Sequence, residues 1–176
     1  MTRPPFPTPT AEEIRVVSEQ LGRPARGVIG IAARCACGAP TVVATSPRLE
    51  DGTPFPTLYY LSHPAASAAI STLEANGVMA EFQAMLAADA ELRAAYARAH
   101  DEYLADRESI ENVPELDGIS AGGMPDRVKC LHALVAHSLA AGPGLNPIGD
   151  LALERTSWSP ARCECELLPD VTKDAP

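Results

Sequence analysis

The hydrophobic and polar positions near the start of the chain follow the period of a helix. Ile14, Val17 and Leu21 recur at spacings of three and four residues. The string TAEE begins at Thr10 and has the form of a capping box, and Gly22 is a typical helix stop. We therefore expect a first helix of about three turns between these two signals.

Three short segments rich in β-branched and aromatic residues come next. They are residues 27–34 (GVIGIAAR), 41–46 (TVVATS) and 57–62 (TLYYLS). Only CACGAP separates the first two, which is short enough for a hairpin, and the loop PRLEDGTPFP (47–56) contains a turn signal. Three antiparallel strands would leave one face for helices to cover.

From Pro64 onward the pattern is helical again. Pro64 suits the first position of a helix, which Asn76-Gly77 would end, and a further turn or two follows over residues 78–87. Asp89 is the expected cap of a long amphipathic helix that ends before Pro114.

The last predicted helix runs from Pro125 to about Ala140. The predicted fold is therefore α+β, with a small antiparallel three-stranded sheet covered by four to five helices. We expect a single domain over residues 10–155, a disordered proline-rich arm over residues 1–9, and a loosely ordered tail over residues 156–176.

Winding the helix from Pro125 at roughly 100° per residue places Asp126, Cys130 and His137 on one side, away from an apolar stripe. His132 lies at the edge of that stripe, so it cannot share a metal ion with Cys130. About 10.5 Å of rise separates Cys130 from His137. The helix alone therefore predicts neither a Cys–His pair nor a metal site. The candidate partners from elsewhere are His63, His100, Cys35 and Cys37.

The glycine-rich loop before this helix is a candidate anion site. Gly122 and Gly123 would leave backbone amides free at the helix N-terminus. Arg127 and Lys129 lie in or next to the first turn, where the helix dipole disfavours cations unless an anion binds nearby. The alternative is a tight turn, because the motif matches neither a Walker loop nor a dinucleotide fingerprint.

Our leading hypothesis is a small ligand-binding or regulatory domain for a phosphate-bearing or carboxylate ligand. Its pocket would lie around the 118–130 loop and helix, between the 47–56 loop and the turn at His63. Arg48, Arg127 and Lys129 would supply positive charge.

An enzyme is the alternative from a different class. Cys130 would then be a catalytic thiolate, activated by the field of the helix N-terminus and by the imidazole of His63 or His100.

A structural zinc ion is a further alternative. Cys35-Ala36-Cys37-Gly38 resembles a zinc knuckle, although it has one intervening residue instead of two, and Cys163 and Cys165 could complete a four-cysteine site. Otherwise Cys130 is a small buried apolar residue and the paired cysteines are incidental. If a metal is bound, its candidate ligands are Cys35, Cys37 and Cys130.

Composition narrows the list of partners. The net charge of −9 argues against nucleic acid and anionic membranes, which need a basic surface. The longest apolar stretch, residues 131–148, is interrupted by polar residues and prolines, and no signal peptide is visible. We therefore expect a cytoplasmic protein, in which the five cysteines are thiols, metal ligands or reactive groups and do not form structural disulfides.

Three strings carry a resemblance to a known family: DGTPFPTLYYLSHP (51–64), SAGGMPDRVKCLHALVAHSLAAGPG (120–144) and NPIGD (146–150). With the pattern RCxxGxPxVVxTxPRL from Arg34, the chain resembles the actinobacterial family catalogued as domain of unknown function 501, over Ala11 to Leu153. Cys37 is not a position of that pattern. The positions shared with the family are Arg48, Asp51, His63, Arg127, Lys129, Cys130, His132 and His137.

The resemblance implies no reaction, because the family has no assigned activity. Its members are often encoded beside enolase, a septum-formation protein and an exopolyphosphatase. This context implies a third hypothesis, a structural adaptor for a protein partner in cell division or polyphosphate metabolism. The positions shared with the family also add Asp51 and His137 to the predicted ligand-binding residues. The full set is Arg48, Asp51, Gly122, Gly123, Arg127, Lys129 and His137.

Overall fold

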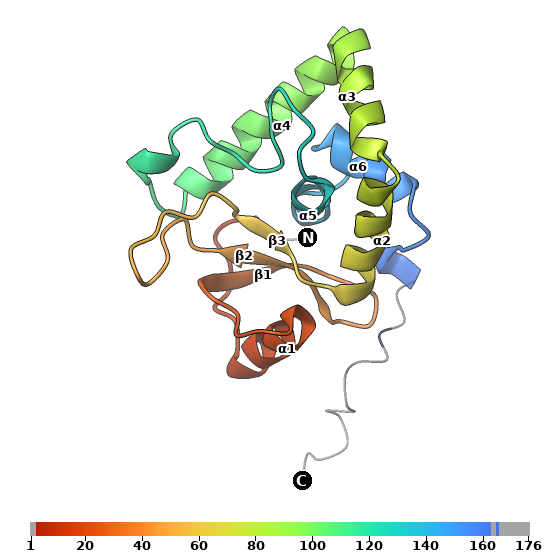
Figure 1. Cartoon of the computed structure of the whole chain (residues 1–176). Helices are drawn as coiled ribbons and strands as arrows, with labels where there is room; N and C mark the ends of the chain where they lie inside the picture. Colours follow the sequence, from red (N-terminus) through yellow and green to blue (C-terminus); the bar gives the residue numbers. More distant parts are fainter. Residues whose placement is uncertain (1–2, 163–164, 166–176) are drawn as a thin grey trace.

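The computed structural model describes residues 3–162 and 165, and it contains a three-stranded antiparallel sheet with helices on both faces (Figure 1). The strands β1 (Val28–Arg34), β2 (Pro40–Thr45) and β3 (Tyr59–Leu61) lie side by side in chain order. Val43 of the central strand faces Ile31 on one side and Tyr60 on the other. The predicted α+β class and the three-stranded sheet are confirmed.

Within the described residues the α-helices are α1 (Ala11–Leu21), α2 (Pro64–Ala75), α3 (Val78–Ala88), α4 (Ala90–Glu108), α5 (Leu131–Ala141) and α6 (Pro147–Glu154). Two 3₁₀-helices, η1 (Pro114–Leu116) and η2 (Pro160–Arg162), follow α4 and α6. Several predicted ends are confirmed. Thr10 and Glu13 form the capping box of α1, Gly22 ends it in the left-handed conformation, and Asp89 caps α4.

The two faces of the sheet are covered differently. On one face, α1 packs Val17 against Ile31 and Val43. On the other, α5 lies across the strands and carries the main core, with α2, α4 and α6 around it (Figure 1). Because β2 is central and covered on both faces, all of its residues are buried.

The helix predicted from Pro125 starts six residues later than expected, at Leu131. The segment before it is an irregular loop, in which the Gln83 side chain donates to Asp126 O at 3.2 Å and accepts from Val128 N at 3.0 Å. A side chain of α3 therefore satisfies backbone groups that a helix would have paired internally. The predicted common face of Asp126, Cys130 and His137 is wrong for this reason.

The helix α6 was missed, although its start signal is present in the sequence. Asn146 accepts a hydrogen bond from Gly149 N at 3.0 Å, and Pro147 occupies the first helical turn. Gly149 lies directly against α5, where a β-carbon would come within 2.3 Å of Leu134 O. Only a glycine allows the two helices to approach this closely.

The segment at residues 3–9, within the arm predicted to be disordered, lies against the domain. Arg3 pairs with Glu102 and Asp106 at 2.7 Å, and Phe6 packs edge-on against Tyr59 with ring centroids 6.4 Å apart. Of the predicted tail, residues 156–162 and 165 are described, and the rest lies outside the described residues. No helix within the described ranges combines the length and the apolar character that a membrane crossing needs.

Candidate functional site

Buried side chains of α4 hold the loop that leads into α5. Arg107 is 2% exposed and donates hydrogen bonds to the carbonyl oxygens of Leu116, at 2.8 Å, and Ile119. The Tyr96 hydroxyl donates to Arg127 O at 2.9 Å. With Gln83 from α3, these bonds give the irregular loop a defined shape that no regular backbone ladder supplies.

The two glycines of this loop are required by its backbone. Gly122 and Gly123 have φ values of +69° and +94°. A β-carbon on Gly122 would lie 2.5 Å from a Leu134 methyl carbon, and one on Gly123 would lie 2.7 Å from Arg127 O. Their carbonyl oxygens accept from Lys129 N and Arg127 N at 2.8 Å. A tight turn accounts for both glycines, so a role of their amides in anion binding stays a prediction.

Two adjoining hollows meet at Cys130. The first has a volume of about 390 Å³ and is lined by β3 and the starts of α2 and α5, including Ser67 and His132. The second has a volume of about 580 Å³ and is lined by the 118–130 loop, including Arg127 and Lys129. Thr57, Cys130 and Ala133 line both hollows. A ligand bound where the two hollows meet would therefore lie next to Cys130.

A carboxylate, an imidazole and a thiol converge at the start of α5. The Oε1 atom of Glu74, near the end of α2, lies 3.2 Å from His132 Nδ1 and accepts from Leu131 N at 2.7 Å. The ligating atoms of Glu74, Cys130 and His132 all lie within 4.8 Å of one another. The helix N-terminus thus already has an anionic partner from within the chain. The same three side chains could hold a metal ion.

The surroundings of His132 favour its protonated form. Its contact with Cys130 and the charge of Glu74, against the opposing effect of burial, raise its pKa to about 9. Its Nε2 atom lies 3.2 Å from both Ser67 O and Ser71 Oγ, while Nδ1 faces Glu74. A protonated imidazole donates from both nitrogens, so these acceptors fit the charged ring.

The predicted separation of Cys130 from His132 is therefore wrong. Cys130 is the N-cap of α5, with φ −153° and ψ 108°, and its side chain does not follow the helical winding. The imidazoles proposed from the sequence have other partners, since His100 Nδ1 lies 2.9 Å from Ser120 Oγ and His63 Nε2 lies 3.0 Å from Cys165 Sγ.

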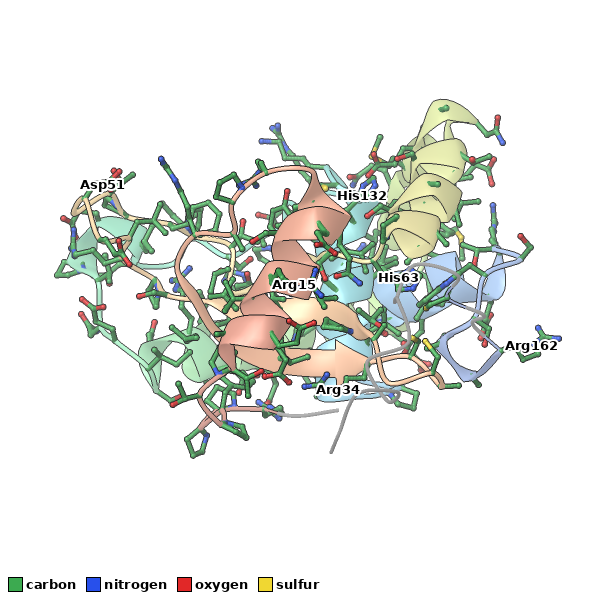
Figure 2. The ribbon with its side chains drawn as sticks, turned by 90° about the horizontal axis from the view of Figure 1, so that it is seen from below. Arg15, Arg34, Asp51, His63, His132 and Arg162 are labelled. Carbon is green, nitrogen blue, oxygen red and sulfur yellow. The ribbon has the colours of Figure 1, made fainter. Side chains whose placement is uncertain are left out.

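Arg48 and Asp51, two of the predicted ligand residues, do not line either hollow. Arg48 pairs with Glu115 at 2.7 Å, so its charge is already matched. Asp51 Oδ1 accepts from Thr53 N at 3.0 Å and stabilises its own turn. Figure 2 shows Asp51 at one edge of the molecule, whereas His132 lies near its middle.

His137, also predicted as a ligand residue, lies in the core and outside both hollows. The ring is fully buried, stacks on Tyr59 with centroids 5.6 Å apart, and meets Tyr103 edge-on. Its Nδ1 atom lies 3.2 Å from Asn146 Nδ2. Burial, helped by the charge of Arg3, lowers the pKa of His137 to about 4, so the ring is neutral at pH 7.

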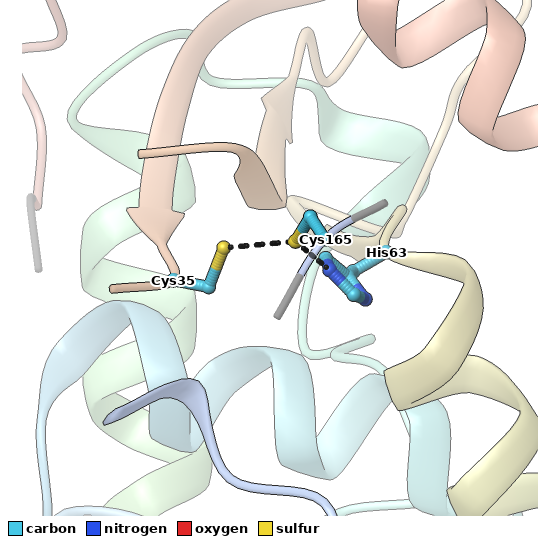
Figure 3. A group of neighbouring side chains, drawn as sticks. All are labelled: Cys35, His63 and Cys165. Atoms are coloured by element: carbon cyan, nitrogen blue, oxygen red, sulfur yellow. Dashed lines mark hydrogen bonds between the residues drawn. The ribbon is translucent and has the colours of Figure 1, made fainter. Parts of the chain in front are cut away.

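A second group of metal-ligating side chains lies at the tip of the β1–β2 hairpin. Cys35, His63 and Cys165 place their ligating atoms within 4.8 Å of one another (Figure 3). Cys37 Sγ lies 3.0 Å from Cys35 Sγ. Of the metal candidates predicted from the sequence, Cys35 and Cys37 are thus together, whereas Cys130 belongs to the group at α5. Cys163 lies outside the described residues.

Comparison with known proteins yields one family. The family model described as "Protein of unknown function (DUF501)" matches residues 31–154, which contain the sheet from Ile31 onward, both hollows and the Cys130 group. No curated protein matches the chain. No solved structure matches it.

Proposed function

The chain belongs to the DUF501 family of proteins of unknown function, and because that membership assigns no activity, we propose from the geometry that it binds a small anionic ligand at Cys130. The observation that carries this proposal is the charge of the two hollows. Arg127 and Lys129 line the larger hollow, and His132, whose charge is paired with Glu74, lines the smaller one, in a chain whose net charge is −9. A phosphate or carboxylate group would complement this local positive charge.

Among the described residues, Arg127 and Lys129 have no carboxylate partner that would compete with a ligand. Within residues 3–162 and 165, Arg127 and Lys129 are exposed and form no salt bridge with another side chain. Several other arginines are paired with carboxylates, namely Arg3, Arg15, Arg34, Arg48 and Arg155. Asp126 lines the same hollow and reduces its charge by one. We expect Arg127 and Lys129 to contact an oxyanion that binds beside Cys130, because all three residues line the same hollow.

Titration calorimetry with phosphate, pyrophosphate, short polyphosphate and citrate tests this function. We expect at least one of these anions to bind. Arg127→Gln and Lys129→Gln should each weaken that binding about tenfold, because each variant removes one charge-assisted hydrogen bond. Arg98→Gln is the matched control, because Arg98 is exposed on α4 and lines neither hollow. Absence of binding by every anion, or an equal loss in the control, would contradict the proposal.

The contact between Cys130 and a protonated His132 favours a second candidate function, thiol catalysis. A cationic neighbour stabilises a thiolate, which is the nucleophilic form of cysteine. Both nitrogens of His132 have hydrogen-bond acceptors, so the ring would act on Cys130 through its charge and would not serve as a base. Anion binding and thiol catalysis would then use the same hollows.

Alkylation with iodoacetamide at pH 7, followed by peptide mass spectrometry, tests this second function. We expect Cys130 to react about tenfold faster than a free peptide thiol, and we expect His132→Asn to remove the difference. His100→Gln should leave the rate unchanged, because His100 contacts Ser120 and lies outside the Cys130 group. A Cys130 that reacts only as fast as a peptide thiol would rule out the activated thiolate.

A further inference from the structure

The hairpin between β1 and β2 presents two cysteines from a tight turn. Cys35 N donates to Ala39 O at 3.1 Å, and Gly38 N donates to Cys35 O at 2.9 Å. Gly38 has a φ of +86°, which lets the chain reverse within this short loop. Cys35 is buried and Cys37 is exposed, yet their sulfur atoms lie 3.0 Å apart. The turn thus brings the two sulfur atoms close together.

Two other parts of the chain bring side chains to the same point. His63 is 4% exposed and caps α2, directly after β3. Cys165 follows η2, and its sulfur lies 3.0 Å from His63 Nε2 and 3.4 Å from Cys35 Sγ (Figure 3). Cys37 joins this point through its 3.0 Å contact with Cys35. Three thiols and one imidazole therefore converge from segments that are far apart in the sequence.

We propose that Cys35, Cys37, His63 and Cys165 form a zinc site with three sulfur ligands and one nitrogen ligand. Zinc prefers this kind of ligand set in tetrahedral geometry, with bonds of about 2.3 Å to sulfur and about 2.0–2.1 Å to nitrogen. Such bonds place neighbouring ligand atoms about 3.5–3.8 Å apart. The separations of 3.0 Å for Cys35–Cys37 and His63–Cys165, and of 3.4 Å for Cys35–Cys165, are slightly shorter. Cys37 lies outside the group whose ligand atoms are all within 4.8 Å of one another. Cys35, His63 and Cys165 would therefore move outward by a few tenths of an ångström, and the exposed Cys37 side chain would turn toward the ion.

The pKa shifts of His63 and Cys37 suit a metal ion, whereas burial raises the pKa of the Cys35 thiol. Burial lowers the pKa of His63, which favours the neutral ring that binds metals. Burial opposes ionisation of Cys37, but hydrogen bonds with Cys165 and Cys35 bring its pKa to about 7. Thiolates are the form that zinc binds, and binding releases the remaining protons.

His63 would have to change one hydrogen bond. Its Nδ1 atom accepts from Ala66 N at 3.4 Å, a long bond that places the ring proton on Nε2. Coordination through Nε2 requires the proton to move to Nδ1, so this cap is given up when the ion binds. A bond to zinc contributes far more than a weak cap, and the exchange favours the metal-bound form.

The site would fasten the segment after α6 to the sheet. Ala36 N already donates to Pro160 O at 2.8 Å, and the Trp158 ring lies 5.6 Å from the ring of His63. Four protein ligands leave no open position, which is typical of a structural zinc ion and not of a catalytic one. Arg34, which pairs with Glu13, also donates to Gly38 O at 3.1 Å and so supports the hairpin turn.

Metal analysis of the purified full-length chain, with melting curves in the presence and absence of a chelator, tests the site. We expect about one zinc ion per chain, and a lower melting temperature after chelation. Replacement by cobalt(II) should give the visible absorption of a tetrahedral thiolate complex. A chain that binds no zinc when reduced and supplied with Zn²⁺ would overturn the proposal, as would a disulfide among these cysteines in the freshly isolated protein.

Single variants identify the ligands. Cys37→Ser and Cys165→Ser should each lower zinc affinity about 100-fold or more. Because Cys37 is exposed, its substitution should leave the circular dichroism spectrum unchanged, which separates loss of the metal from loss of the fold. Cys130→Ser is the matched control and should retain the ion. Loss of zinc in that control, or in Cys163→Ser, would overturn the assignment of these four ligands.

Discussion

Replacement of Gly149 by alanine is expected to lower the free energy of unfolding by about 3 kcal/mol, through overpacking of a well-packed contact. The new β-carbon would lie 2.3 Å from Leu134 O and 2.8 Å from the β-carbon of Ser138. The first of these atoms belongs to the backbone of α5, which cannot rotate away, so the two helices must separate. Chemical denaturation followed by circular dichroism would measure the change.

Glu154→Ala provides the control for this variant. Glu154 is exposed near the end of the same helix, and its substitution should change the free energy of unfolding by less than about 0.5 kcal/mol. If Gly149→Ala were as stable as this control, α5 and α6 would not be in the close contact that the structure shows. The consequence extends to function, because displacement of α5 would also move Cys130 and His132 at its start.

Acidification from pH 7 to pH 4 is expected to destabilise the protein by about 3 kcal/mol through His137 alone. The folded-state pKa of His137 is about 4, against an ordinary value of 6.5. Between these values the unfolded chain binds a proton that the folded protein does not bind. Stability therefore falls as the pH drops through this window, and the loss is complete below pH 4.

Denaturation curves at several pH values, for the natural chain and for His137→Gln, would measure this effect. The glutamine variant has no proton to bind at this position, so its stability should depend much less on pH between 6.5 and 4. His63 contributes in the same direction, because burial also lowers its pKa. An equal pH dependence in both proteins would show that His137 is accessible to protons in the folded state.

The local parts of the fold could be predicted because their signals lie within a few residues of one another. The capping box at Thr10, the stop at Gly22 and the Asp89 cap each depend on side chains that bond their own backbone. The three strands depend on β-forming residues between clear turn signals. Such signals act in the same way wherever the element packs, so the sequence was sufficient for them.

The start of α5 could not be predicted in this way. Pro125 and the apolar spacing after it are compatible with a helix. The irregular loop that forms instead depends on Gln83 and Tyr96, which precede it by about 30 to 45 residues. Because these side chains bond the loop backbone, residues up to Cys130 remain outside the helix. Because Cys130 lies outside the helix, its side chain does not follow the helical winding and lies beside His132.

The sequence by itself thus determined the α+β class, the resemblance to the family, and which residues have the chemistry to bind an ion or a ligand. Only the tertiary structure decided how they are grouped: Cys130 with His132 and Glu74, and Cys35 and Cys37 with His63 and Cys165. The physical reason is that a ligand set is defined by distances of a few ångströms between side chains. In this chain, the members of each set come from segments that approach one another only when the helices pack on the sheet.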